Sequence, residues 1–320
     1  MNNANRPMTR ILAGGLVAAP LALLPAVASA AESAEIRFAT PSWPGVTVKT
    51  QLTAELLTAL GYETSQQEVG ATIAYEALNL GEVDAFMAAW LPAQGPMYEA
   101  SIEKDTLVDL GNNVDGARLG LAVPRYVAEA GLTSLEDLDK DEFAEKLGRE
   151  IYSIEVGSGM SETLNGGIDN DTYGLGDWTP VETSTPGMLS AVNNAINNNE
   201  WIVFAGWTPH WMNIEYDVVY LDDPQDMWGP NGGSSDVRTL LSKTYSESHP
   251  NATRLLDQVT FSADDQSAMI YEYSYNERDS EEVAIEWIKQ HPERVEAFAE
   301  GVTTIDGEPA WPALQKAFGL

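Results

Sequence analysis

The sequence contains no cysteine and few basic residues. Its 320 residues include 17 Lys and Arg, 49 Asp and Glu and 3 His, which gives a formal net charge of −32. The absence of cysteine excludes disulfide bonds, thiolate metal sites, a cysteine nucleophile and an acylated cysteine anchor. Because so negative a chain would be repelled by a phosphate backbone, we expect no nucleic-acid partner. The acidic residues are spread along the chain, which predicts a hydrated, self-repelling surface of the kind found in salt-adapted proteins.

Common catalytic motifs are absent as well. The chain has no Walker A sequence, no His-Glu-x-x-His and no Gly-x-Ser-x-Gly. Asp169-Asn170-Asp171 is similar to the start of an EF-hand calcium loop, but Pro180 stands where that loop requires a glutamate. We therefore predict a protein that is not an enzyme, with no catalytic residue, no cofactor and no metal ligand that the sequence identifies. A calcium site of another kind stays open, and so do carboxylate pairs, which spacing does not identify in so acidic a chain.

Residues 1–30 predict a cleavable signal peptide. Arg6 and Arg10 precede an uncharged stretch that reaches residue 31, and Ala28-Ser29-Ala30 has the small-x-small pattern that signal peptidase cleaves. A membrane-spanning helix is the alternative, because the stretch is long enough. However, it is rich in alanine and glycine and contains two prolines. Cleavage after Ala30 predicts a free protein in a bacterial periplasm.

The remainder of the chain alternates between strand-like and helix-like segments. Apolar runs and periodicity predict strands at 36–40, 62–69, 83–89, 119–123, 151–156, 201–205 and 218–221. The same reasoning predicts helices at 46–60, 71–80, 188–198, 264–275 and 281–290, two of which stop before Gly61 and Gly81. This alternation is typical of α/β layers with mostly parallel sheets.

Two buried strands are predicted to end in Trp-x-Pro, and they lie 117 residues apart. Trp90 closes the apolar run 85–91, and Trp207 closes the run 202–208. Trp43 follows the first predicted strand in the same way. Ligands bind at the carboxyl ends of strands in open α/β sheets, so we expect all three indoles at such an edge.

Several indoles suit a quaternary ammonium ion, because it has no N–H to donate and its diffuse charge is attracted to aromatic faces. Sugar-binding clefts also use tryptophan platforms, so the pattern alone leaves a secreted carbohydrate-active enzyme open. Ordinary core packing of all three indoles, in an interaction domain, is the third interpretation.

The chain resembles the periplasmic choline- and glycine-betaine-binding proteins, which are substrate-binding components of ABC importers for quaternary ammonium compounds. The resemblance runs over nearly all of the chain after the predicted cleavage site. It is carried by the segments 36–43, 88–92, 121–131, 206–210, 229–233, 301–304 and 317–320.

The resemblance implies a two-lobed α/β fold of the periplasmic-binding-protein type (type II-like), with two crossover hinge strands and the ligand in the cleft between the lobes. Lobe one would comprise residues 31–117 and 219–320, and lobe two residues 118–218. Trp43 and Trp90 would stand on lobe one and Trp207 on lobe two, so that hinge closure brings the rings together.

The sequence departs from the choline-type pattern at two positions. Choline binders of this kind carry an acid where this chain has Gly45, and a cage tyrosine where it has Leu119. Losing an acid removes a charge that would repel a carboxylate, which favours betaine-like zwitterions. Candidate donors to that carboxylate are the backbone N–H groups of Gly45 and Val46, together with His210 and Ser158.

We therefore expect non-catalytic capture of a quaternary ammonium osmolyte. Glycine betaine is preferred over choline, carnitine, proline betaine and trimethylamine N-oxide. The expected partners are that small ligand and the membrane permease of an ABC importer, and the expected state is a monomer.

Overall fold

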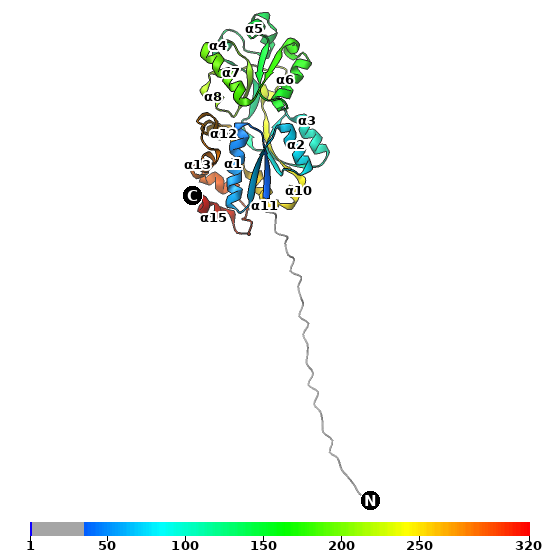
Figure 1. Ribbon diagram of the computed structural model, residues 1–320, viewed down its shortest axis with the longest axis vertical. Helices are drawn as coiled ribbons and strands as arrows, with labels where there is room; N and C mark the ends of the chain where they lie inside the picture. Colours follow the sequence, from blue (N-terminus) through cyan, green and yellow to red (C-terminus); the bar gives the residue numbers. More distant parts are fainter. Residues whose placement is uncertain (2–34) are drawn as a thin grey trace. The chain divides into compact units, whose positions relative to one another are not determined.

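The computed structural model describes Met1 and residues 35–320. Apart from Met1, the predicted signal peptide and its cleavage site lie outside the described residues. Residues 35–320 fall within one compact unit, which is built around two five-stranded sheets (Figure 1). In this part of the chain no helix is both long and apolar enough to cross a bilayer.

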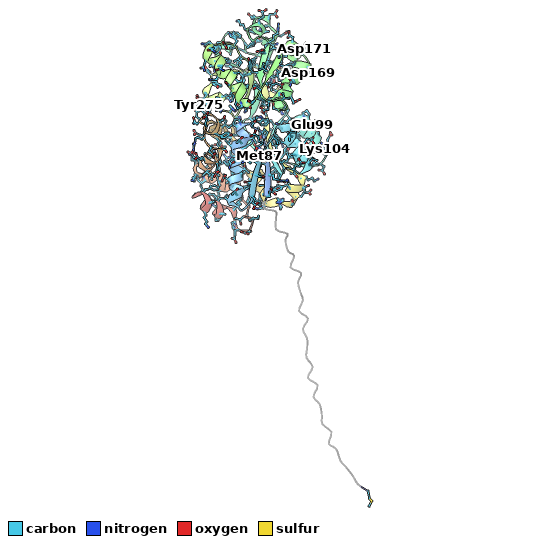
Figure 2. All side chains as sticks on the ribbon, viewed as in Figure 1. Met87, Glu99, Lys104, Asp169, Asp171 and Tyr275 are labelled. Carbon is cyan, nitrogen blue, oxygen red and sulfur yellow. The ribbon has the colours of Figure 1, made fainter. Side chains whose placement is uncertain are left out.

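The first sheet has the strand order β2-β1-β3-β11-β4. These strands span, in that order, Glu63–Glu68, Glu35–Thr40, Ala85–Leu91, Asp236–Ser242 and Leu107–Asn112. β1 pairs in parallel with β2 and β3, whereas β11 pairs antiparallel with β3 and β4. β3 is therefore central, which agrees with its apolar sequence. Met87, labelled in Figure 2, lies in the middle of β3 and is fully buried.

The second sheet has the strand order β10-β6-β9-β7-β8. These strands span, in that order, Val218–Tyr220, Arg118–Pro124, Phe204–Thr208, Glu150–Ser153 and Thr179–Glu182. β7 pairs in parallel with β8 and β9, whereas β6 pairs antiparallel with β9 and β10. The prediction of mostly parallel sheets is therefore wrong at β6 and β11. Each of these two strands follows a passage of the chain from the other sheet. It therefore runs through its own sheet in the direction opposite to its neighbours.

The chain passes between the sheets twice, and the two passages are bonded to each other. The first passage lies between β5 (Val114–Asp115) and β6, and the second precedes β11. The Ser235 backbone N–H donates to the Ala117 carbonyl oxygen at 3.0 Å, and Arg118 and Ser234 form a β-bridge. β5 also pairs in parallel with β12 (Phe261–Ser262).

The lobe boundaries stay a prediction, and one of them falls inside a strand. A return to lobe one at residue 219 would divide β10, which pairs with β6 of the second sheet. We propose that the return lies instead just before β11, at residues 233–235, because both sheets then remain whole.

The longer helices lie on both sheets (Figure 1). The first sheet is accompanied by α1 (Pro44–Ala59), α2 (Ala71–Leu80), α3 (Gly95–Glu103), α10 (Lys243–Ser248), α11 (Pro250–Gln258), α12 (Ala263–Ile270), α13 (Ser280–Gln290), α14 (Pro292–Phe298) and α15 (Ala310–Phe318). The second is accompanied by α4 (Arg125–Glu129), α5 (Asp141–Lys146), α6 (Gly159–Asp169), α7 (Thr185–Asn198) and α8 (Met212–Glu215). A one-turn helix, α9 (Pro230–Gly233), precedes β11, and a π-helical turn at Tyr271–Tyr275 extends α12.

Helix α1 is the platform on which much of the site is built. It begins with Pro44, which suits a first helical position, and ends before Gly61. Gly61 has a φ of +98°, and a Cβ there would come within 2.6 Å of Ile305 Cγ2, so glycine is required. Val48 and Leu52 are fully buried on the inner face of the helix. The start of α1 is thereby held rigidly at the carboxyl end of β1.

Candidate ligand-binding site

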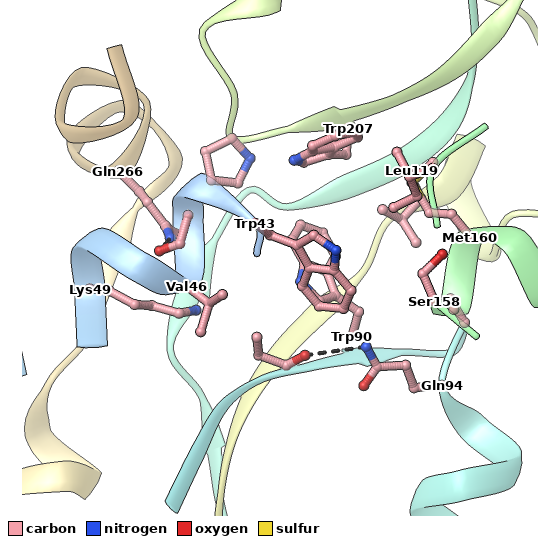
Figure 3. Close-up of a pocket in the computed structure, with 16 residues that line it drawn as sticks. Trp43, Val46, Lys49, Trp90, Gln94, Leu119, Ser158, Met160, Trp207 and Gln266 are labelled. Atoms are coloured by element: carbon pink, nitrogen blue, oxygen red, sulfur yellow. Dashed lines mark hydrogen bonds between the residues drawn. The ribbon is translucent and has the colours of Figure 1, made fainter. Parts of the chain in front are cut away.

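A cavity lies between the carboxyl ends of strands from the two sheets (Figure 3). The space among its lining atoms is about 530 Å³, including the part that is open to solvent. The first sheet and its helices contribute Trp43, Gly45, Val46, Lys49, Ala88, Trp90, Ala93, Gln94 and Gln266. The second contributes Leu119, Ile154, Ser158, Gly159, Met160, Trp207 and Pro209. Six of the seven residues predicted as ligand contacts therefore line one cavity, and the seventh, His210, does not.

Trp90 and Trp207 hold equivalent positions in the two sheets. Each is the last residue but one of its strand, β3 or β9, and each strand lies inside its sheet. Trp207 is 6% exposed and Trp90 is partly buried. Both indoles therefore lie at strand ends, as predicted. The cavity brings together these two residues, which are far apart in the sequence.

Trp43 connects the two sheets directly. It precedes α1 at the end of β1, and its indole N–H donates to the Glu155 carboxylate, which belongs to the loop after β7. The second oxygen of that carboxylate is buried and has no hydrogen-bond partner. Glu155 therefore fixes the orientation of the Trp43 ring and places a negative charge beside its polar edge.

The first turn of α1 presents backbone N–H groups to the cavity. Gly45 and Val46 occupy this turn, where a helix leaves its N–H groups without intrahelical acceptors. Gln266, from α12, donates to the Gly45 carbonyl oxygen at 2.6 Å, and its own amide oxygen is buried without a partner. A Cβ on Gly45 would lie 2.9 Å from Gln266 Nε2. The glycine therefore allows close packing of α12 against this turn.

Lys49 lies one helical turn farther along α1 and was not predicted. Its side chain is 1% exposed, and its ammonium donates to Asn113 Oδ1 at 2.7 Å. Burial lowers the pKa of Lys49 well below its ordinary value, and no neighbouring charge offsets this effect. Figure 3 shows the ammonium directed toward the space beside Val46 and Trp43.

Ser158 is both a helix cap and a part of the cavity wall. It is 2% exposed, and its hydroxyl oxygen accepts from the Ser161 backbone N–H at 3.1 Å at the start of α6. The hydroxyl hydrogen is still available to donate. The next residue, Gly159, lies so close to the turn between β3 and α3 that a Cβ there would be 3.0 Å from both Ala93 and Gln94.

His210 lies behind Trp207 rather than on the cavity wall. It is fully buried, and its ring centroid is 4.7 Å from that of Trp207. Its Nδ1 accepts from the Met212 backbone N–H at 3.1 Å, so the ring hydrogen is on Nε2, which has no partner. Burial lowers the pKa of His210 from 6.5 to about 3. The ring is therefore neutral and does not line the cavity, and the contact between His210 and a ligand stays a prediction.

Sequence reasoning missed the polar residues that helices bring to the cavity. Lys49 and Gln266 come from α1 and α12, and Gln94 precedes α3. Gln94 is 1% exposed, with its amide oxygen unpartnered. A helical periodicity places Lys49 one turn from Gly45, which is a usable signal, but nothing in the sequence indicates that the lysine is buried.

Further contacts join the two halves around the cavity. The Thr72 hydroxyl, on α2, donates to the Gly157 carbonyl oxygen at 3.3 Å. On another side, the Trp211 indole N–H donates to Ser274 Oγ at 3.1 Å, and the Trp211 and Tyr275 rings lie 5.1 Å apart. Together with Trp43 and Glu155, these contacts hold the two sheets in a closed arrangement.

Two mixed sheets, two adjacent passages and a cavity between strand ends define the fold of the periplasmic substrate-binding proteins of ABC transporters. The family model described as the substrate binding domain of ABC-type glycine betaine transport systems (OpuAC) matches residues 34–290. The chain belongs to this family.

Individual relatives agree with this assignment. The glycine betaine/carnitine transport binding protein GbuC of Listeria monocytogenes is 31% identical over 189 residues, which cover 59% of this chain and 62% of that protein. The match therefore spans less than two thirds of that relative's length.

Two solved structures are similar in fold. An ABC-transporter choline-binding protein in complex with choline has a TM-score of 0.86 and 29% identity, covering 89% of this chain and 98% of that one. Lactococcal OpuAC, in its closed-liganded conformation with glycine betaine, has a TM-score of 0.75 and 27% identity, covering 82% and 98%.

Proposed function

We propose that the protein captures a quaternary ammonium zwitterion, most favourably glycine betaine, and delivers it to the permease of an ABC importer. The observation that carries this proposal is the convergence of Trp43, Trp90 and Trp207 on one small cavity. The family assignment and the betaine- and choline-binding relatives support the ligand class. The carbohydrate-active alternative finds no support in a transport family.

The three indoles would hold the methylated cation. Each aromatic face attracts a cation by roughly 0.5–2 kcal/mol, and most strongly when water is excluded. Three rings would therefore supply several of the roughly 8 kcal/mol that micromolar binding requires. Glu155 accepts from the Trp43 indole N–H, and this hydrogen bond makes the ring more electron-rich and its attraction for a cation stronger.

The carboxylate of the ligand would be held by neutral donors. Candidates on the cavity wall are the backbone N–H groups of Gly45 and Val46 and the hydroxyl of Ser158. The His210 Nε2–H is a buried donor without an acceptor, and leaving such a group unpaired costs about 1–3 kcal/mol. A ligand oxygen reaching it past Trp207 would satisfy this donor.

Capture would proceed by closure of the two halves about their paired passages. Contacts made only in the closed form shift the open–closed equilibrium toward it, and the permease would recognise that form. We further propose that residues 1–30 direct export, so that a monomeric protein acts in the periplasm. Choline, carnitine, proline betaine and trimethylamine N-oxide are alternative ligands of the same class.

Removing cage indoles tests this proposal. We expect tryptophan fluorescence of the wild-type protein to change saturably with micromolar glycine betaine. Trp90→Ala and Trp207→Ala should each weaken binding by tenfold or more, because each removes one ring from the cation. Trp201→Ala is the matched control, since Trp201 stacks on Phe143 at 6.0 Å and lies outside the cavity.

Two results would contradict the proposal. If no methylated amine in a calorimetric panel binds the wild-type protein, the proposed function is wrong. If Trp201→Ala weakens binding as much as Trp90→Ala, the cage is wrong even though binding occurs.

A further inference from the structure

Lys49 is the only ionisable side chain that lines the cavity within the described residues. It is 1% exposed, and no carboxylate forms an ion pair with it in this part of the chain. Buried ammonium groups are normally paired, because removing an isolated charge from water is costly. The charged form of Lys49 therefore calls for a counter-charge that the described protein does not supply and that an anionic ligand group would provide.

The position of the ammonium is fixed by its surroundings. Asn113 accepts from Lys49 through Oδ1, while its Nδ2 donates to the Met87 carbonyl oxygen at 3.1 Å and to Thr239 Oγ1 at 2.8 Å. Asn113 is thus locked in one orientation and holds the Lys49 ammonium in place. One of the three ammonium hydrogens is used by Asn113, and the other two are available.

Lys49 also lies on the side of the cavity where an anion is favoured. It shares α1 with Gly45 and Val46, whose N–H groups form the positive end of the helix. In Figure 3, Lys49 and Val46 lie on one side, Ser158 and Met160 on the other, and Trp43 and Trp90 between them. A zwitterion would span this arrangement with its cation on the indoles and its anion on α1.

We propose that Lys49 binds the anionic end of the ligand and makes the cavity selective for zwitterions that carry a carboxylate over choline-like cations. This inference rests on the proposed function and names the group that determines the ligand class. In a water-poor cavity the ammonium attracts a carboxylate and repels a ligand that is only cationic. The ionisable groups that contact the cage indoles, Glu155 at Trp43 and His210 at Trp207, do not line the cavity.

The experiment measures the ratio of the choline and glycine betaine dissociation constants by calorimetry. Lys49→Met removes the charge, and Lys49→Gln keeps a hydrogen-bond donor for Asn113. We expect both variants to lower the ratio by tenfold or more, through weaker betaine binding and unchanged or stronger choline binding. Lys104→Met removes an exposed lysine on the surface (Figure 2) and should leave the ratio unchanged.

A second measurement uses the wild-type protein alone, in case a variant does not fold. Neither ligand titrates between pH 7 and 10, and burial lowers the pKa of Lys49, so its ammonium loses its proton at a lower pH than an ordinary lysine does. The affinity for betaine should therefore fall as the pH rises, while that for choline does not fall. His210 does not contribute to this change, because burial lowers its pKa to about 3 and the ring is already neutral at pH 7.

Each outcome decides the inference. An unchanged ratio in both Lys49 variants, or parallel pH profiles for the two ligands, would show that Lys49 is a structural donor to Asn113. Such a result leaves the proposed function intact, because wild-type binding of betaine is measured in the same series. Failure of the wild-type protein to bind either ligand would overturn the proposed function, and the inference with it.

Discussion

At the scale of single residues, Gly45 leaves the proposed carboxylate-binding side of the cavity without an acidic side chain. Its Cα is part of the first turn of α1, and Lys49 follows four residues later on the same helix face. An acid at this position would pair with Lys49 and place a negative charge beside the cavity. The glycine leaves the ammonium and the helix N–H groups free to meet a carboxylate.

Gly45→Asp should therefore weaken glycine betaine binding by about tenfold, the equivalent of roughly 1.4 kcal/mol, and leave choline binding equal or stronger. Calorimetry with both ligands measures this. Gly45→Ala is the control, because any Cβ at this position must displace Gln266, whose Nε2 would be 2.9 Å away. Equal losses of affinity for betaine and choline in Gly45→Asp would contradict the assignment.

At the scale of elements, the residue that caps the start of α6 also lines the cavity. Ser158 accepts from the Ser161 N–H, and Ser184 caps α7 in the same way by accepting from the Gly187 N–H at 3.3 Å. Ser158 lines the cavity and Ser184 does not. Variants of the two serines therefore distinguish the loss of a helix cap from the loss of a proposed ligand contact.

Ser158→Ala and Ser184→Ala should each lower the free energy of unfolding by about 1 kcal/mol, the usual cost of a lost N-cap. Urea denaturation measures this. Only Ser158→Ala should also weaken betaine binding, by several-fold in calorimetry. An unchanged affinity in Ser158→Ala would limit this serine to its capping role.

The elements that local signals specify were predicted well. Helix α2 was placed at residues 71–80, as observed, because its apolar spacing and the following Gly81 with a left-handed φ of +69° mark both ends. β4 and β11 were missed, since β11 is stabilised by pairing with β3, about 150 residues earlier in the chain. β9 runs three residues beyond the predicted strand because Gly206 and Trp207 pair with β6.

The site was predictable to the same extent. Trp43, Trp90 and Trp207 follow apolar runs that mark strand ends, and a sequence shows such runs directly. Lys49 and Gln266 lie on helices, and their burial depends on how α1 and α12 pack against each other. Because that packing is a property of the assembled fold, no local pattern identifies these residues as parts of a cavity.

At the scale of the whole molecule, closure requires close approach at Gly159. A Cβ there would lie 3.0 Å from the carbonyl carbon and Cβ of Ala93 and from Gln94 Cγ. The neighbours include backbone, which yields little. The glycine therefore allows the start of α6 to touch the turn between β3 and α3.

Gly159→Ala should hold the two halves slightly apart and weaken betaine binding by tenfold or more, since overpacking typically costs 1–3 kcal/mol. Calorimetry measures the affinity, and small-angle X-ray scattering of the betaine-saturated protein should report a larger radius of gyration. Gly166→Ala is the control on the same helix, because a Cβ there has no neighbour within 4 Å. Wild-type affinity in Gly159→Ala would mean that closure tolerates the extra methyl group.

The bond between Ser235 and Ala117 has a consequence for how the molecule can move. Two strands tied side by side behave as one ribbon, which bends readily across its width but resists shearing along its length. We therefore expect the proposed opening to be a hinge bend across the two paired passages, because sliding of one half along the other would break the bond between Ser235 and Ala117. We expect each closure to return the Trp43 indole to the Glu155 carboxylate, so that every bound ligand is enclosed by the same cavity wall.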